Sequence, residues 1–266
     1  MSRRRSERVL VHRVENGHAP KRLPDELIVE EPLEIRLDGH LVATTMRTPG
    51  NDFELAAGLC FTDGLLADAA VTTCRYCEDG RNAMEGNFNI VTVETGGRAP
   101  VPQPRLTPTT SSCGLCGSTS IDDLRARLQP LDVEPMPLEL LASMPDRVRA
   151  GQTLFDRTGG VHAAAAFDLT GTPIVVREDI GRHNAVDKVI GRMLLDGMLP
   201  AAELGLWVSG RASFEIVQKA WAGGFAALVA VSAPSNLAVE AARAAGLTLA
   251  GFARPQRLNI YAPADL

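Results

Sequence analysis

The pattern of apolar and polar positions divides the chain into a short-stranded first part and a second part in which strands alternate with helices. Residues 32–47 alternate apolar and polar side chains around Asp38-Gly39, a dipeptide that favours the tight turn of a β-hairpin. Asp52 is a candidate N-cap for the helical pattern that follows it. Residues 88–93 form a further apolar run typical of a strand. These patterns predict an α+β first part.

Beyond residue 160 the pattern becomes a regular alternation of strand and helix. Residues 161–167 and 173–176 are predicted to pair as strands across a Gly-containing turn. Three strand-like runs and three helix-like runs then alternate, namely a helix over 186–194, strand 204–208, helix 213–221, strand 225–231, helix 237–245 and strand 247–251. Such an alternation implies βαβ crossovers, and therefore an α/β fold with a mainly parallel sheet covered by helices on both faces.

Stretches rich in glycine and proline, which interrupt helices and strands, indicate where the chain divides into segments. Residues 96–111 contain two glycines and four prolines and are predicted to be a linker. A second cluster of prolines, between residues 130 and 145, surrounds a short helical stretch. We therefore expect four segments: a flexible basic arm (1–22), a small α+β domain (23–110), a cysteine loop with a helix (111–130) and an α/β domain (131–266).

Charge and hydropathy exclude several classes of protein. The net charge is −5, although residues 1–22 carry seven basic and two acidic side chains. A basic arm is able to contact nucleic acid or anionic lipid, but a solvated, mobile N-terminus is the favoured interpretation. The acidic remainder argues against a nucleic-acid-binding domain. The longest apolar run is seven residues, 225–231, whereas a membrane helix needs about 20. We expect a cytoplasmic protein without a membrane segment or secretory signal.

The strongest chemical signal is Cys113-Gly114-Leu115-Cys116, a pair of thiols in a Gly- and Ser-rich loop before a predicted helix at 121–128. The positive end of a helix dipole lowers the pKa of a nearby thiol and favours the thiolate. Glycines leave such a thiolate sterically open. The pattern therefore favours attack on sulfur, either thiol–disulfide exchange or acceptance of a sulfane sulfur as a persulfide. A thioredoxin-type motif fits poorly, because a proline-rich linker precedes the pair.

A second pair, Cys74 and Cys77, keeps another interpretation open. Together with Cys113 and Cys116 it could form a tetrahedral Cys₄ zinc site. The 35 residues between the pairs exceed the spacing of a compact zinc ribbon. Alternatively, Cys74 and Cys77 are buried, inert thiols. The odd total of five cysteines argues against a disulfide framework.

Polar residues follow three predicted strands at the point where each strand ends. The first such segment, residues 177–188, places a glycine and several basic side chains at a helix start, which suits an anion such as phosphate. Ser209-Gly210-Arg211-Ala212-Ser213 and residues 232–236 occupy the same position in the next two units. Ligands of open α/β sheets bind outside the carboxyl ends of strands, so one shared crevice for a phosphate-bearing ligand is predicted. Ordinary helix capping and local ion pairs, such as Glu178 with Arg182, are the alternative.

His162, at the start of a predicted strand, is weighed as a metal ligand and set aside. A zinc deaminase requires a Glu two residues after the His and a Pro-Cys-x-x-Cys segment. Ala164 occupies the first position, and Pro234 is followed by Ser235 rather than Cys. A lone His on an alternating strand is more often a structural residue, and no resident metal is predicted.

Taken together, the motifs resemble those of the FdhD family, the sulfurtransferase accessory proteins of formate dehydrogenase. The resemblance runs from Pro32 to Tyr261 and rests on segments 111–117, 155–162, 178–188, 209–211 and 252–254. It implies a second domain similar to cytidine deaminases, a homodimer, and two protein partners, a cysteine desulfurase and formate dehydrogenase. It also implies a cargo, the molybdenum bis(molybdopterin guanine dinucleotide) cofactor, for which GDP is a partial mimic.

The resemblance assigns the persulfide to Cys113, with Cys116 as its partner, and cofactor contacts to the segment from Phe252 to Arg257. With the strand-end loops, the predicted cofactor-binding residues are Phe252, Ala253, Arg254, Pro255, Gln256, Arg257, Arg182, His183, Asn184, Lys188, Ser209, Gly210 and Arg211. The leading hypothesis is persulfide transfer to a bound, nucleotide-tailed cofactor. The alternative is a non-catalytic cofactor chaperone whose four cysteines hold structural zinc.

Overall fold

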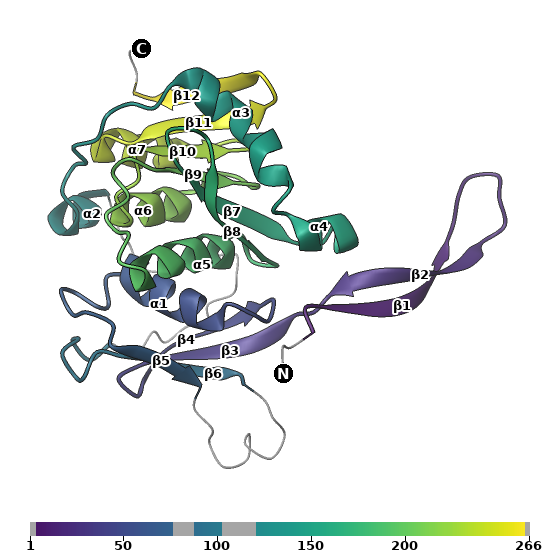
Figure 1. Cartoon of the computed structure of the whole chain (residues 1–266), viewed down its shortest axis with the longest axis horizontal. Coiled ribbons are helices and arrows are strands. Elements are labelled where there is room, and N and C mark those ends of the chain that lie inside the picture. Colours follow the sequence, from purple (N-terminus) through teal and green to yellow (C-terminus); the bar gives the residue numbers. More distant parts are fainter. Residues whose placement is uncertain (1–3, 77–87, 103–120, 264–266) are drawn as a thin grey trace.

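The computed structural model describes residues 4–76, 88–102 and 121–263, which contain three sheets and seven helices (Figure 1). The first part holds a four-stranded sheet in the order β4-β3-β6-β5 and one helix, α1. The bounds are β3 Glu31–Leu37, β4 His40–Arg47, α1 Asp52–Thr62, β5 Thr73–Tyr76 and β6 Ile90–Glu94. The α+β prediction for this part is confirmed.

The predicted β3–β4 hairpin is present and turns at Asp38-Gly39. Both residues have positive φ angles, 46° and 86°, which is the geometry that joins tightly paired strands. The Asp38 carboxylate accepts a hydrogen bond from the backbone N–H of Thr95 at 2.7 Å and another from its hydroxyl. This contact fixes the turn against the chain that leaves β6.

The start of α1 differs from the prediction. The N-cap is Asn51, in the left-handed region at φ 58°, and Asp52 is the first helical residue. The Asp52 carboxylate instead accepts two hydrogen bonds from Arg47, with Nη2 to Oδ2 at 3.0 Å, and both side chains are fully buried. A buried guanidinium needs such a partner, so Asp52 neutralises a charge instead of capping the helix.

The second part is built on a six-stranded sheet in the order β12-β11-β10-β9-β7-β8. Its strands are β7 His162–Phe167, β8 Pro173–Asp179, β9 Gly205–Val208, β10 Ala227–Ala230, β11 Thr248–Arg254 and β12 Arg257–Ala262. Only β9, β10 and β11 are parallel neighbours, whereas β7 pairs antiparallel with both β8 and β9, and β12 pairs antiparallel with β11. The α/β class is confirmed, and the sheet is mixed rather than mainly parallel.

Helices cover both faces of this sheet, as predicted (Figure 1). One face packs against α2 Ile121–Arg127, α5 Arg182–Leu195, α6 Phe214–Ala222 and α7 Asn236–Ala245. The other face packs against α3 Leu138–Arg149, and α4 Thr153–Thr158 precedes β7. Within the described residues no helix combines the length and apolar character needed to cross a membrane.

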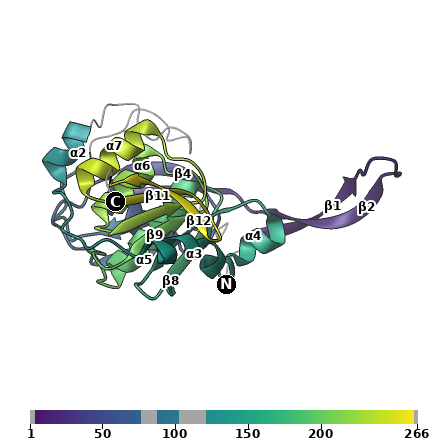
Figure 2. The same cartoon turned by 90° about the horizontal axis from the view of Figure 1, so that it is seen from above.

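The predicted flexible arm contains regular structure. β1 Ser6–Arg13 and β2 Lys21–Ile28 form an antiparallel two-stranded ribbon that projects away from both larger sheets (Figures 1 and 2). The base of the ribbon is held to α4, because the Glu26 carboxylate accepts hydrogen bonds from Arg157 and from the Ser6 hydroxyl. The predicted segment boundary after residue 22 therefore falls inside a strand.

Helices α1 and α5 join the two parts of the chain and lie between the two larger sheets (Figure 1). They meet at two glycines, since a Cβ added at Gly58 would collide with the backbone carbonyl of Asp187, and one at Gly191 with that of Glu54. Charged pairs flank this crossing. Arg177 contacts Glu54, with Nη2 to Oε1 at 2.8 Å, and Asp187 accepts a hydrogen bond from Lys219 at 2.8 Å.

We predict that Gly58→Ala destabilises the protein by about 3 kcal/mol, since the new methyl group overpacks two helix backbones that cannot separate without breaking their flanking contacts. Urea unfolding followed by circular dichroism measures the change. Gly160→Ala is the matched control, because a Cβ there would come no closer than 3.4 Å to Ile28. Equal stabilities of the two variants would contradict this description of the helix crossing.

Candidate functional site

The predicted strand-end residues do lie along one edge of the six-stranded sheet. The pairing directions place the carboxyl ends of β8, β9, β10 and β11 at that edge, together with the start of β7. The loops that follow these strands are tied to one another, because Ser232 N donates to Gly210 O and Phe252 N donates to Ser232 O, both at 3.1 Å. We refer to residues 162, 180–183, 209–213, 232–235 and 252–257 as the strand-end site.

The carboxylate of Asp179, at the end of β8, organises the first of these loops. It is fully buried and accepts four hydrogen bonds: from Lys188 Nζ at 2.6 Å, Asn184 Nδ2 at 2.9 Å, Gly181 N at 2.8 Å and Thr48 N at 3.1 Å. Lys188 Nζ also donates to the carbonyl oxygen of Thr48 at 2.9 Å. The loop that opens α5 is thereby fastened to the loop that precedes α1.

Two residues predicted to bind the cofactor instead form buried hydrogen bonds within this arrangement. Lys188 is fully buried against Asp179, and desolvation lowers the pKa of its ammonium group. Asn184 is buried and donates to the Met46 carbonyl at 2.8 Å as well as to Asp179. A ligand outside the sheet edge cannot reach either side chain, so the structure gives both a scaffolding role instead of the predicted cofactor contacts.

The local ion pair considered for Glu178 and Arg182 is not formed. The Glu178 carboxylate accepts hydrogen bonds from the backbone N–H groups of Leu154 and Phe155, both at 2.8 Å, and so satisfies the first turn of α4. Arg182 is left at the edge, and its Nε is buried without a hydrogen-bond partner among the described residues. A buried guanidinium N–H without a partner is costly. Arg182 as a whole is half-buried, so its positive charge remains at the edge.

Two histidines flank Arg182 at the strand-end site. His162 Nδ1 lies 3.4 Å from Ser209 Oγ, and His183 Nε2 lies 3.4 Å from Ser213 Oγ. Burial lowers the pKa of His183 to about 4, assisted by neighbouring positive charges, and burial also lowers the pKa of His162. Both imidazoles are therefore neutral at pH 7, and Arg182 carries the positive charge of this corner.

His162 and Ser213 are not among the predicted cofactor-binding residues. His162 looked like an ordinary strand residue, because the sequence pattern does not reveal that β7 runs against its neighbours and so begins where they end. Ser213 belongs to the predicted strand-end segment 209–213, and it is the N-cap of α6 without a side-chain cap hydrogen bond. The order of strands in the sheet is the missing signal for His162.

Phe252 presents an aromatic ring at the same edge. Its backbone has φ 51°, its side chain is 42% exposed, and β11 continues beyond it. A bulky residue in the left-handed region is strained, and the shift of the β11–β12 register between Gly251 and Arg254 places this strain at a β-bulge. An exposed aromatic face of this kind can stack on a nucleobase.

The rest of the predicted segment forms the tip of the β11–β12 hairpin. Arg254 Nη1 donates to the carbonyl oxygens of Val231 at 2.6 Å and Ala253 at 2.8 Å, which ties this hairpin to the end of β10. The Ala253 side chain is fully buried in the core and is not available to a ligand, contrary to the prediction. Arg211 at the strand-end site is exposed.

A groove of about 650 Å³ runs between the hairpin tip and α3. Its lining includes three residues of the predicted segment, Pro255, Gln256 and Arg257, and two carboxylates of α3, Glu139 and Asp146. All three tip residues are exposed, and Gln256 turns the chain at φ 64°. The tip therefore combines one guanidinium with acidic neighbours, which makes it a weaker phosphate site than the Arg182 corner.

Cys113, Cys116 and Cys77 lie outside the described residues, and so does the predicted thiol pair. Of the four cysteines in the zinc alternative, the structure describes Cys74. That residue is half-buried on β5, where burial raises the pKa of its thiol to about 11. Cys60 is fully buried in α1 and its thiol pKa is raised further. Both thiols are protonated and weakly nucleophilic at pH 7.

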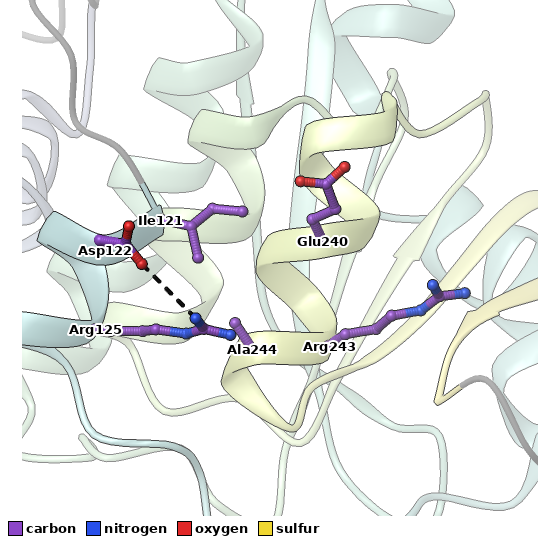
Figure 3. Close-up of a pocket in the computed structure, with 6 residues that line it drawn as sticks. All are labelled: Ile121, Asp122, Arg125, Glu240, Arg243 and Ala244. Carbon is purple, nitrogen blue, oxygen red and sulfur yellow. Dashed lines mark ion pairs between the residues drawn. The ribbon is translucent and has the colours of Figure 1, made fainter.

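The chain that follows the predicted thiol loop begins at α2, as expected for residues 121–128. Figure 3 shows a pocket of about 460 Å³ between α2 and the C-terminal half of α7, lined by Ile121, Asp122, Arg125, Glu240, Arg243 and Ala244. Asp122 and Arg125 form an exposed ion pair at 3.7 Å. The acidic and basic side chains that line the pocket balance one another in charge, so the pocket has no preference for an anion.

Known proteins resemble this chain over nearly its whole length. It is 50% identical to the sulfur carrier protein FdhD of Streptomyces avermitilis, a match that covers 97% of this chain and 94% of that protein. It is 46% identical to the protein of the same name from Anaeromyxobacter dehalogenans, covering 93% and 89%. A crystal structure from Desulfotalea psychrophila, named as a formate dehydrogenase accessory protein, has the same fold, with a TM-score of 0.73, 22% identity and 98% coverage of both chains.

The match to a family is as extensive as the match to individual relatives. Residues 28–265 fit the FdhD/NarQ family, a span that includes both larger sheets, the seven helices of the described residues and the strand-end site. The chain therefore belongs to the FdhD/NarQ family.

Proposed function

We propose that this protein is a sulfur carrier that takes a sulfane sulfur from a cysteine desulfurase onto Cys113 and delivers it to a guanine-nucleotide-tailed molybdenum cofactor destined for formate dehydrogenase. The observation that carries the proposal is the strand-end site, where the ring of Phe252 and the half-buried Arg182 line one sheet edge. One donor of Arg182, Nε, has no partner in the part of the chain that the structure describes. Support also comes from relatives at about 50% identity that are named sulfur carrier proteins.

Loading of the carrier is a thiol exchange. The Cys113 thiolate attacks the terminal sulfur of a persulfide on the desulfurase, a new S–S bond forms on Cys113, and the desulfurase cysteine leaves as a thiolate. The thiols of Cys60 and Cys74 are excluded from this role, because burial keeps both protonated. Cys116 is the neighbouring thiol that accompanies Cys113.

The strand-end site fits the nucleotide tail of the cargo. A guanine stacks on the exposed face of Phe252, and a phosphate accepts hydrogen bonds from Arg182 and from backbone groups at the start of α5, where the helix dipole favours negative charge. Neutral His162 and His183 supply donors without adding charge. When bound, the cofactor supplies the molybdenum centre that receives the sulfur.

We predict that incubation with a cysteine desulfurase and cysteine adds about 32 Da, one sulfur atom, to the peptide that contains Cys113. Intact-mass and peptide mass spectrometry measure the adduct, and it is lost in Cys113→Ser. The peptides that contain Cys60 and Cys74 serve as internal controls and remain unmodified. Maturation of formate dehydrogenase by the Cys113→Ser variant would contradict the proposal, and stoichiometric zinc bound by the four cysteines would favour the chaperone alternative.

We predict that GDP stabilises the protein, since a ligand that binds only the folded state at a concentration of 100 Kd adds about 2.7 kcal/mol. Phe252→Ala raises the Kd for GDP by about 5- to 150-fold, because stacking of a base on an aromatic ring contributes about 1 to 3 kcal/mol. Calorimetric titration measures the Kd. Phe88→Ala, which removes a similarly exposed ring from the N-terminal part, leaves it unchanged. Equal affinities of the two variants would place the nucleotide elsewhere.

A further inference from the structure

The short helix α2 begins eight residues after Cys113, the cysteine to which the carried sulfur is assigned above. A chain of eight residues spans at most about 29 Å, so the position of Ile121 limits where Cys113 can lie. Whatever fixes α2 on the body of the protein therefore also limits the volume in which the thiol of Cys113 can meet another molecule.

α2 is too short to hold its own shape and direction. It has seven residues, and isolated helices shorter than about 12 residues are marginal in water. Its side chain Leu124 is fully buried against the core. The pocket of about 460 Å³ between α2 and α7 leaves the packing on that side incomplete (Figure 3). A second point of attachment is needed to fix the direction of the helix.

Arg127, in the last turn of α2, provides this attachment at the C-terminal end of α1. Its Nη1 donates to the carbonyl oxygen of Asp63 at 2.7 Å, and its Nη2 donates to that of Thr62 at 3.3 Å. Carbonyl groups at a helix C-terminus lack partners within the helix and carry partial negative charge, which favours a cation. Because α1 has no basic residue in its own last turn, Arg127 supplies the cation from another helix.

Gly64, which follows the end of α1, makes room for the guanidinium group. A Cβ added at Gly64 would collide with Arg127 Nη1 and would lie 3.1 Å from Cδ and Cζ of the same side chain. Gly64 also has a φ of 74°, a conformation that side chains other than glycine rarely adopt. The turn after α1 is therefore shaped so that Arg127 lies directly on the backbone.

The end of α1 that receives Arg127 is itself fixed in the core. Thr62 is fully buried, and its hydroxyl group donates to Asp187 Oδ1 at 2.9 Å and accepts from Lys219 Nζ at 2.8 Å. These two partners belong to α5 and α6. α2 is thus attached through an exposed arginine to a buried junction of three helices.

We propose that Arg127 is a positioning residue for sulfur transfer, which holds α2 on the end of α1 and so fixes the origin of the segment that carries Cys113. This inference rests on the function proposed above, and Arg127 acts through α2 rather than on the sulfur. Without the Arg127 contact, the next hydrogen-bonded attachment along the chain is Gln129, whose carbonyl oxygen accepts from Trp221 Nε1 at 2.8 Å. The tether from Cys113 then doubles from eight to sixteen residues, which lowers the effective concentration of the thiol about threefold.

Hydrogen exchange of the full chain, measured by mass spectrometry, tests the attachment without any sulfur chemistry. Arg127→Ala speeds the exchange of the α2 amides about tenfold, because two hydrogen bonds from a charged group are lost, and leaves exchange elsewhere unchanged. Arg127→Lys restores part of the protection. Arg125→Ala is the matched control, since it removes an exposed arginine of the same helix that pairs with Asp122, and it leaves the α2 amides as protected as in the wild type. Equal exchange in the two alanine variants would refute the attachment.

Steady-state loading by a cysteine desulfurase, with this protein as the varied substrate, tests the positioning role. Arg127→Ala raises the KM about threefold and leaves kcat unchanged, because the longer tether is ordered when the two proteins bind. Arg127→Lys returns the KM toward the wild-type value, and Arg125→Ala leaves it unchanged. The rate at which iodoacetamide alkylates Cys113, followed on its peptide, is the same in every variant, since the thiol itself is unaltered.

The outcomes separate this inference from the function on which it rests. A wild-type chain that accepts no sulfur would overturn the proposed function and the positioning role with it. A wild type that accepts sulfur, beside an Arg127→Ala variant with an unchanged KM or a lowered kcat alone, would overturn the positioning role and leave the proposed function standing.

Discussion

The carboxylate of Asp179 is the group on which the rest of this structure depends. It lies where β8 ends, and it is buried with the ammonium group of Lys188 at 2.6 Å. A lone buried charge would cost more free energy than the fold can supply, so the pair and its backbone partners form together. Because Thr48 of the first part supplies one of those partners, the same carboxylate holds the N-terminal sheet against the six-stranded sheet.

The burial of Asp179 explains why residues 178–188 both hold the fold together and contribute to the strand-end site. Residues 178–188 include polar side chains directed inward, which hold α4, the loop before α1 and the crossing of α1 with α5. The residues between them, Gly181 to His183, are left at the sheet edge with a buried Arg182 donor that has no partner in the described part of the chain. Alternation of scaffold and site residues within this one segment keeps the ligand-facing groups rigid, which suits the proposed recognition of a nucleotide.

Much of the fold follows from patterns that the sequence displays directly. The Asp38-Gly39 hairpin and the alternation of strands with helices after residue 160 were predictable because each depends on neighbours in the chain. Features that depend on distant partners were not predictable. Asp52 does not cap α1 because Arg47 takes its carboxylate, and the direction of β7 is set by its place in the sheet. Packing on the sheet also carries α3 through Pro145 to Arg149, beyond the predicted short helix.

The candidate site also includes features that depend on distant residues and were therefore not predictable from the sequence. Glycine, serine and arginine at strand ends indicated that these segments share one sheet edge, as they do. Burial alone decides that Lys188, Asn184 and Ala253 face inward. A sequence pattern shows the type of a side chain but not the group with which that side chain forms a hydrogen bond or ion pair. The strain at Phe252 and the closeness of His162 to Ser209 likewise appear only once the strands are ordered in space.

The central claim is that Lys188 stabilises the fold and does not contact the ligand. The most direct test is the Lys188→Met variant, in which the free energy of unfolding and the Kd for GDP are measured on the same preparation. If Lys188 is scaffold, the free energy of unfolding falls by about 3 to 5 kcal/mol, because the Asp179 charge loses its partner. The Kd for GDP of the remaining folded protein stays within about twofold of the wild-type value, well short of the tenfold that 1.4 kcal/mol of lost contact would produce. A variant that unfolds like the wild type and has lost GDP binding would contradict it.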